Sequence, residues 1–143
     1  MKKNGRGESG MDLGTESCFV RECIKKEYRE RLELELQSKK RRSKAISRFA
    51  HDCVKILQVG YQTVTANELA RLLGAVSEKE SCYLITDGAG DGTTMPMQKA
   101  RELLQNAYMP VILISPGLVV IKPEAEGGRA AYYVFLFARE RGS

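Results

Sequence analysis

The chain has no tryptophan and only one histidine, and none of its four cysteines belongs to a Cys-x-x-Cys pair. It also has no apolar run of the roughly 20 residues that a membrane-spanning helix needs. No apolar stretch of signal-peptide length follows the basic first residues. These absences argue against a membrane partner, secretion and a zinc site of common spacing. We therefore expect a cytoplasmic protein with reduced cysteines, the alternative being a protein with two disulfides.

The composition is that of a folded chain of ordinary size. Of its 143 residues, 43% are hydrophobic and 29% are charged, so the bulk of the chain is not disordered by composition. Residues 1–14 contain several glycines and no apolar periodicity, which is typical of a flexible tail. We expect a single domain over 15–143, with a helical half at 15–75 and a sheet half at 81–139.

Three helices are expected in the first half. Thr15 or Ser17 could cap the first one, whose apolar residues recur every three or four positions from Phe19 onward. The segment 32–36 alternates like a strand, but Leu and Glu favour a helix there. A second apolar stripe runs over 46–57. Residues 65–74 form the third helix, because Thr65 and Glu68 match a capping box and Gly74 suits a helix end.

The second half changes to short apolar runs separated by turns. Strands are expected at 82–86, 111–114, 118–121 and 131–137, with a helix over 97–104. Pro116 and Gly117 stand where a type II turn needs them. The last strand is apolar on both faces, which favours a central position. The order ααα-βαβββ predicts an α+β fold, with the N-terminal helices on one side of a small, mostly antiparallel mixed sheet. Its first two long strands could form a parallel crossover.

The positive charge is concentrated in the first third of the chain. Residues 1–50 hold 14 basic and 8 acidic side chains, whereas 51–143 hold 9 and 10. A short basic run can hold phosphates by charge alone, or it can be a solvated connection between helices. The candidate residues for binding nucleic acid or another anion are Lys39, Lys40, Arg41, Arg42, Lys44 and Arg48.

A second candidate site is the glycine-rich loop that follows the first strand of the second half. A strand, a Gly-x-Gly-x-Gly loop and a helix form a context for binding phosphate at a helix N-terminus. However, Thr93 replaces the third glycine of the dinucleotide pattern, and Ala89 and Gln98 break the calcium-loop pattern. The alternative is a solvated turn. The candidate loop residues are Asp87, Gly88, Gly90, Asp91 and Gly92.

Residues 46–57, 63–64 and 67–74 resemble the opening of a winged helix-turn-helix domain, and the hairpin 117–133 resembles its wing. The resemblance implies DNA binding, with Lys99 and Arg101 facing a groove and Arg129 in the wing. The sequence departs from that family after Gly74, where a strand-like run replaces the recognition helix.

Nothing in the sequence forms a catalytic or metal-ligating set, and no cofactor is expected. His51, Asp52 and Cys53 point in different directions on a helix and cannot form a triad. We expect a non-catalytic binding protein whose basic helical region contacts nucleic acid or an acidic protein surface. One alternative is a regulator or toxin-neutralising immunity protein that binds a protein partner; another is a small enzyme or cofactor binder that uses the glycine-rich loop 87–92. The first helix could also form a homodimer.

Overall fold

The computed structural model describes residues 12–106, 109–123 and 131–137. Within these residues six helices and six strands form an α+β fold, as predicted. The helices are α1 (Leu13–Cys23), α2 (Lys26–Gln37), α3 (Arg42–His51), α4 (Cys53–Ile56), α5 (Ala66–Gly74) and α6 (Met97–Asn106). The strands are β1 (Gln62–Val64), β2 (Ser81–Thr86), β3 (Thr93–Pro96), β4 (Val111–Ser115), β5 (Leu118–Lys122) and β6 (Tyr132–Leu136).

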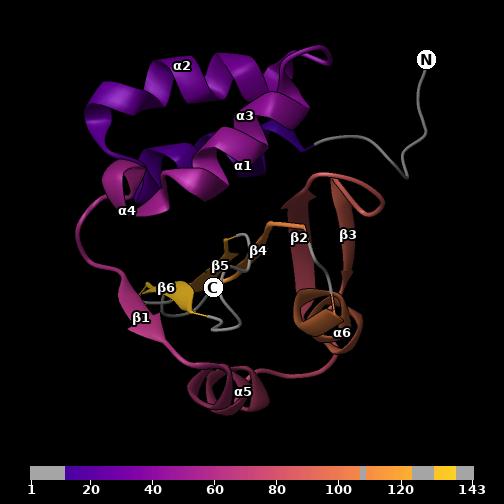
Figure 1. Cartoon of the computed structure of the whole chain (residues 1–143). Helices are drawn as coiled ribbons and strands as arrows, with labels where there is room; N and C mark the ends of the chain where they lie inside the picture. Colours follow the sequence, from indigo (N-terminus) through magenta and orange to yellow (C-terminus); the bar gives the residue numbers. More distant parts are fainter. Residues whose placement is uncertain (1–11, 107–108, 124–130, 138–143) are drawn as a thin grey trace.

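The strands form one antiparallel sheet in the order β1-β6-β5-β4-β2-β3 (Figure 1). β6 lies between β1 and β5, which confirms that the last strand is internal to the sheet. The parallel crossover is wrong, because β2 pairs antiparallel with β4 across the α6 connection. The sheet is therefore not mixed.

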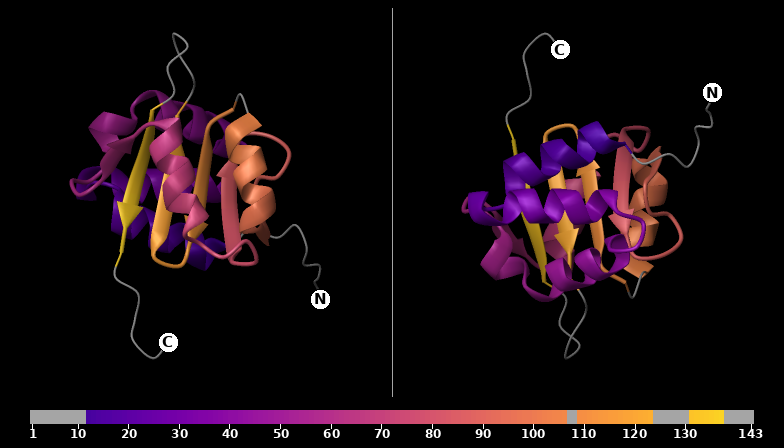
Figure 2. Two further views of the ribbon diagram at one scale, coloured as in Figure 1. Left: turned by 90° about the horizontal axis from the view of Figure 1, so that it is seen from below. Right: turned by 90° about the horizontal axis from the view of Figure 1, so that it is seen from above.

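Helices cover both faces of the sheet (Figure 2). Helices α1 to α4 pack on one face through Phe19, Ile46 and Phe49, against sheet residues such as Ile85 and Phe135. The first two of the three predicted N-terminal helices therefore lie on one side of the sheet, as expected, but the third, over 65–74, does not. Helices α5 and α6 cover the other face through a second core cluster that includes Leu69, Leu73, Met97, Ala100 and Leu104. The result is three layers, in which every central strand is buried on two sides.

Several local signals act as the sequence indicates. Leu32 and Leu36 are buried and Leu34 is exposed, so the alternating segment is helical. Thr65 and Glu68 form both hydrogen bonds of the capping box. The first helix differs: it begins at Leu13 and its cap is Asp12, whose carboxylate accepts from the Thr15 amide.

The long helix expected over 46–57 begins earlier and is broken. Helix α3 ends at His51, and Asp52 separates it from the single turn of α4. No helix in the described part of the chain is long and apolar enough to cross a membrane.

The short strand β3 follows the glycine-rich loop and pairs with β2. The loop therefore closes a β-hairpin and does not lead directly into a helix. The winged-helix arrangement is also absent from the described residues, because the segment after α5 enters a six-stranded sheet between two helical layers.

Candidate anion-binding groove

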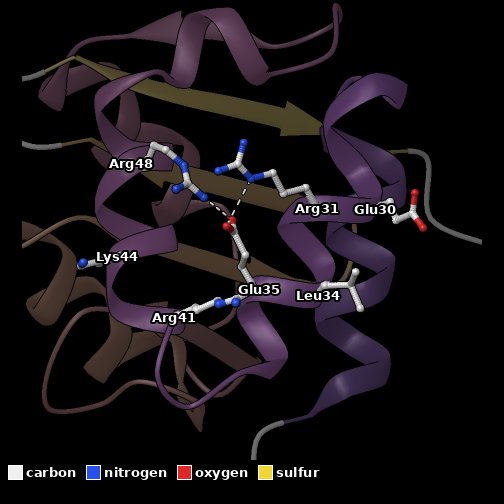
Figure 3. Close-up of a pocket in the computed structure, with 7 residues that line it drawn as sticks. All are labelled: Glu30, Arg31, Leu34, Glu35, Arg41, Lys44 and Arg48. Atoms are coloured by element: carbon white, nitrogen blue, oxygen red, sulfur yellow. Dashed lines mark hydrogen bonds and ion pairs between the residues drawn. The ribbon is translucent and has the colours of Figure 1, made fainter.

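A groove of about 630 Å³ lies between α2 and α3 on the outer surface of the helical layer (Figure 3). We call it the basic groove. It is lined by Glu30, Arg31, Leu34 and Glu35 from α2, by Lys44 and Arg48 from α3, and by Arg41 just before α3. Four of the seven side chains are basic and two are acidic, so the groove has a net positive charge.

Helical spacing explains why these residues share one surface. Arg41, Lys44 and Arg48 are separated by three and four positions, which places them along one face of α3. On the opposite face, Ile46 and Ala50 are buried. Because α3 packs on the sheet through its apolar face, its basic stripe faces solvent and α2.

The loop between α2 and α3 extends this positive surface. Lys39 and Lys40 are exposed there, next to Arg41 and Lys44, which are also exposed. None of these four side chains forms an ion pair with another described residue. We call Lys39, Lys40, Arg41 and Lys44 the free cation cluster.

The free cation cluster lies at the N-terminal end of α3, which is the positive end of the helix dipole. Arg41, the capping residue, makes no side-chain cap, and the first turn contains no acidic residue. The neighbouring carboxylate of Asp87 belongs to the β2–β3 loop and accepts a 2.8 Å hydrogen bond from the Ser43 hydroxyl. Cations at this end of a helix are each unfavourable by about 0.3 to 1 kcal/mol, and a bound anion would offset that cost.

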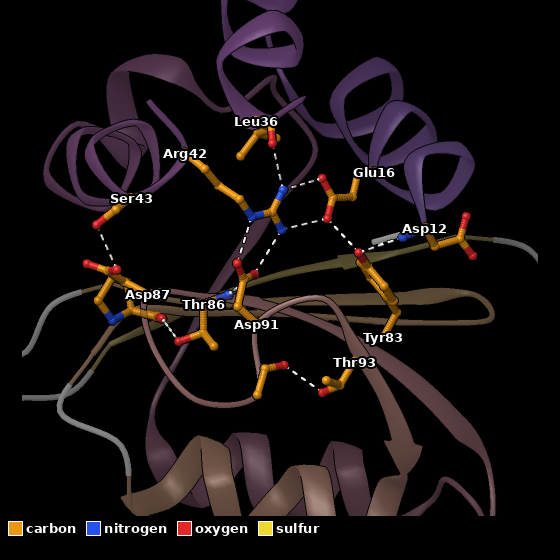
Figure 4. Close-up of polar contacts among 12 residues, drawn as sticks. Asp12, Glu16, Leu36, Arg42, Ser43, Tyr83, Thr86, Asp87, Asp91 and Thr93 are labelled. Carbon is orange, nitrogen blue, oxygen red and sulfur yellow. Dashed lines mark hydrogen bonds and ion pairs between the residues drawn. The ribbon is translucent and has the colours of Figure 1, made fainter. Parts of the chain in front are cut away.

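Arg42 differs from the other five predicted residues, because its guanidinium is buried between the helical layer and the sheet (Figure 4). Its Nε donates to Asp91 Oδ2 at 2.7 Å. Its Nη2 donates to Asp91 Oδ1 at 2.8 Å and to Glu16 Oε2 at 2.7 Å. Its Nη1 donates to Glu16 Oε1 and to the Leu36 carbonyl, both at 2.8 Å. All five donors are used, so Arg42 has none left for an added anion.

The same network includes Tyr83 of β2, whose hydroxyl donates to Glu16 at 2.6 Å and accepts from the Asp12 amide at 2.9 Å. Burial, together with the hydrogen bond to Glu16, raises the pKa of Tyr83. Burial by itself would lower the pKa of Arg42, but its hydrogen bonds to Asp91 and Glu16 raise it. The network is therefore a neutral tyrosine and a permanently charged arginine between two carboxylates. Its role is to join the helical layer to the β2–β3 hairpin.

The glycine-rich loop is shaped by the hairpin that it closes. Gly88, Gly90 and Gly92 all have positive φ values, of 140°, 97° and 72°. Asp91 accepts from Arg42 and from the Thr86 amide at 3.1 Å, and Asp87 accepts from Ser43. Both carboxylates thus have protein partners. Among the described residues, no group of three or more His, Cys, Asp or Glu is placed to hold a metal ion.

The structure therefore brings the two predicted sites close together, through the contacts of Arg42 and Ser43 with the loop, but it gives them different roles. Sequence reasoning did not identify Glu16 as a partner of Arg42. The available signal was position: Glu16 is three, four and seven residues before the buried Phe19, Val20 and Cys23. A charged residue that shares a helix face with an apolar stripe is buried together with that stripe. A buried charge needs an oppositely charged or hydrogen-bonding partner.

The residues suggested by the winged-helix resemblance are scattered. Lys99 is exposed on α6, and Arg101 forms a 3.4 Å ion pair with Glu78. Arg129 lies outside the described residues. The four cysteines are free thiols, and only Cys18 is exposed.

No protein-family model, no curated protein sequence and no solved structure matches this chain.

Proposed function

We propose that the chain is a non-catalytic binding protein that holds the sugar-phosphate backbone of nucleic acid against the basic groove and the free cation cluster. The observation that carries this proposal is the free cation cluster itself. Four exposed cations with no ion-pair partner among the described residues gather at the positive end of α3. A surface of this kind is costly to assemble and is favourable only toward anions.

The dimensions of the basic stripe support a polyanion in preference to a single ion. From Arg41 to Lys44 and Arg48 the helix rises about 10 Å. That distance equals the axial rise of about three phosphates along one strand of duplex DNA. Lys39 and Lys40 continue the positive surface beyond the helix end. Contacts of this type are to phosphates, so we expect binding without sequence preference.

The glycine-rich loop supports no second proposal, because its two carboxylates accept hydrogen bonds from Arg42, Ser43 and Thr86. An acidic protein surface offers carboxylates in place of phosphates, and the experiment below separates the two.

The test is fluorescence anisotropy of a labelled duplex oligonucleotide at several salt concentrations. We expect a dissociation constant near 1 to 100 μM for the wild type, weakening steeply with salt. The variant K39Q/K40Q/R41Q/K44Q should bind more weakly, and its slope of log K against log salt should be shallower by about 3.

The matched control is R21Q/K26Q/K55Q/K79Q, which removes the same charge from four exposed positions outside the basic groove. It should retain most of the affinity. Absence of wild-type binding at low salt, or equal losses in both variants, would overturn the proposal. If polyglutamate displaces the oligonucleotide at equal charge concentration, the partner is an acidic protein surface and not nucleic acid.

A further inference from the structure

An acidic side chain occupies the middle of the basic groove. Glu35 of α2 receives a hydrogen bond from Arg31 Nε at 3.3 Å, one turn earlier on the same helix. Its other carboxylate oxygen accepts from Arg48 of α3. In Figure 3 both arginines point toward this carboxylate, one from each wall of the groove.

A carboxylate between two guanidinium groups stands where a phosphate group would bind. Guanidinium forms the same charge-assisted hydrogen bonds with both anions, because each offers paired oxygens to the planar donors. Arg31 and Arg48 are both exposed. Each ion pair has one exposed arginine, while the Glu35 side chain is only 12% exposed. Exposed ion pairs contribute about 0 to 1 kcal/mol each, so an incoming anion that binds both arginines can offset the loss of the Glu35 contacts.

We propose that Glu35 is an internal competitor for a phosphate subsite formed by Arg31 and Arg48. This inference rests on the proposed function and specifies how the basic groove is regulated. A nucleic acid backbone first meets the free cation cluster. It gains the two arginines only when the Glu35 side chain leaves them, so Glu35 limits both the affinity and the number of phosphates engaged.

The groove offers a matched control. Glu30 also lines it and carries the same charge, but it makes no ion pair with a described residue and points away from the Glu35 carboxylate (Figure 3). The variant E30Q therefore changes the charge of the groove without releasing an arginine. The difference between E35Q and E30Q measures the release of Arg31 and Arg48.

The experiment compares wild type, E35Q, E30Q and E35Q/R48Q in the anisotropy titration, with melting temperatures to verify folding. We expect E35Q to bind the oligonucleotide about five- to tenfold more tightly, with a salt slope steeper by about 1 to 2. E30Q should change the affinity less than about twofold, since one exposed charge has a small effect. The double variant should lose most of the gain.

Equal affinities of E35Q and E30Q, with the wild type binding, would overturn the internal competitor and leave the proposed function in place. No binding by the wild type would overturn the proposed function, and this inference with it. A second measurement uses the wild type alone: the side-chain Nε–Hε NMR signals of Arg31 and Arg48 should shift on addition of oligonucleotide. Unchanged signals at saturation would also overturn the inference.

Discussion

Arg42 shows how strongly position determines the role of a single residue. It belongs to a run of cations that look equivalent in the sequence, yet it is 6% exposed, as is fitting for a residue four positions before the buried Ile46. Its charge is balanced by Glu16, which is 3% exposed, and by Asp91. The basic run predicts the free cation cluster from composition alone. It does not reveal that Arg42 is already ion-paired, because its two carboxylate partners are distant in sequence, in α1 and in the β2–β3 loop.

Replacing Arg42 should therefore cost far more stability than replacing its neighbour. In R42M the buried Glu16 and the partly buried Asp91 lose their cationic partner, and we expect a loss of about 3 to 5 kcal/mol in the free energy of unfolding. The control R41M removes an exposed cation and should change it by less than about 0.5 kcal/mol. Denaturation with urea measures both, and equal stabilities would show that the network does not hold the helical layer in place.

At the scale of elements, turns and caps follow local rules, whereas the short strands do not. The Thr65 capping box and the helical segment 32–36 depend on neighbours in sequence, and both were predicted correctly. Strands β1 and β3 contain three and four residues and were not predicted. Such segments carry too little apolar pattern to be recognised, and they become strands because β6 and β2 offer unpaired edges.

The turn between β4 and β5 tests whether a single turn residue determines local conformation and contributes to stability. Gly117 has φ +77°, which a type II turn requires at its third position. A side chain in this left-handed region costs about 1 to 2 kcal/mol, so G117A should lower the melting temperature. The control P116A alters the position before it, where most residues are tolerated, and should have a smaller effect. The reverse order of effects would contradict this description of the turn.

In the whole molecule, three of the four thiols are buried and inaccessible to reagents in solution. Cys23 and Cys53 lie in the core beneath the N-terminal helices, and Cys82 lies in the core on the other face. Burial raises the pKa of all three, that of Cys53 to about 12 with a contribution from Asp52, so almost none of the reactive thiolate is present near neutral pH. The arrangement of helices on both faces produces this protection. The sequence predicts that helices cover one face of the sheet but not that α5 and α6 cover the other. Each of these two helices has one apolar stripe, and the stripe does not indicate which face of the sheet it packs against.

Thiol labelling of the native protein near pH 8 checks this packing. We expect Cys18 to react rapidly with an aromatic disulfide reagent, and the other three cysteines only after unfolding. The variant C18S should show no fast phase. Rapid reaction of a second thiol in native protein would indicate that one of the two helical layers opens readily.

The pairing of β1 with β6 has a consequence for how the chain is made. Gln62 lies opposite Val134, so β1 has no strand to pair with until β6 has been synthesised. The hairpins β2–β3 and β4–β5 join neighbours in sequence and can form earlier. A nascent chain halted before Tyr132 would therefore present the open edge of β5, and the core-facing position of Phe135 would be empty. An exposed, apolar strand edge is the part of a growing chain that most readily pairs with another copy. Translation through the final strand is thus the step that protects this protein from aggregation.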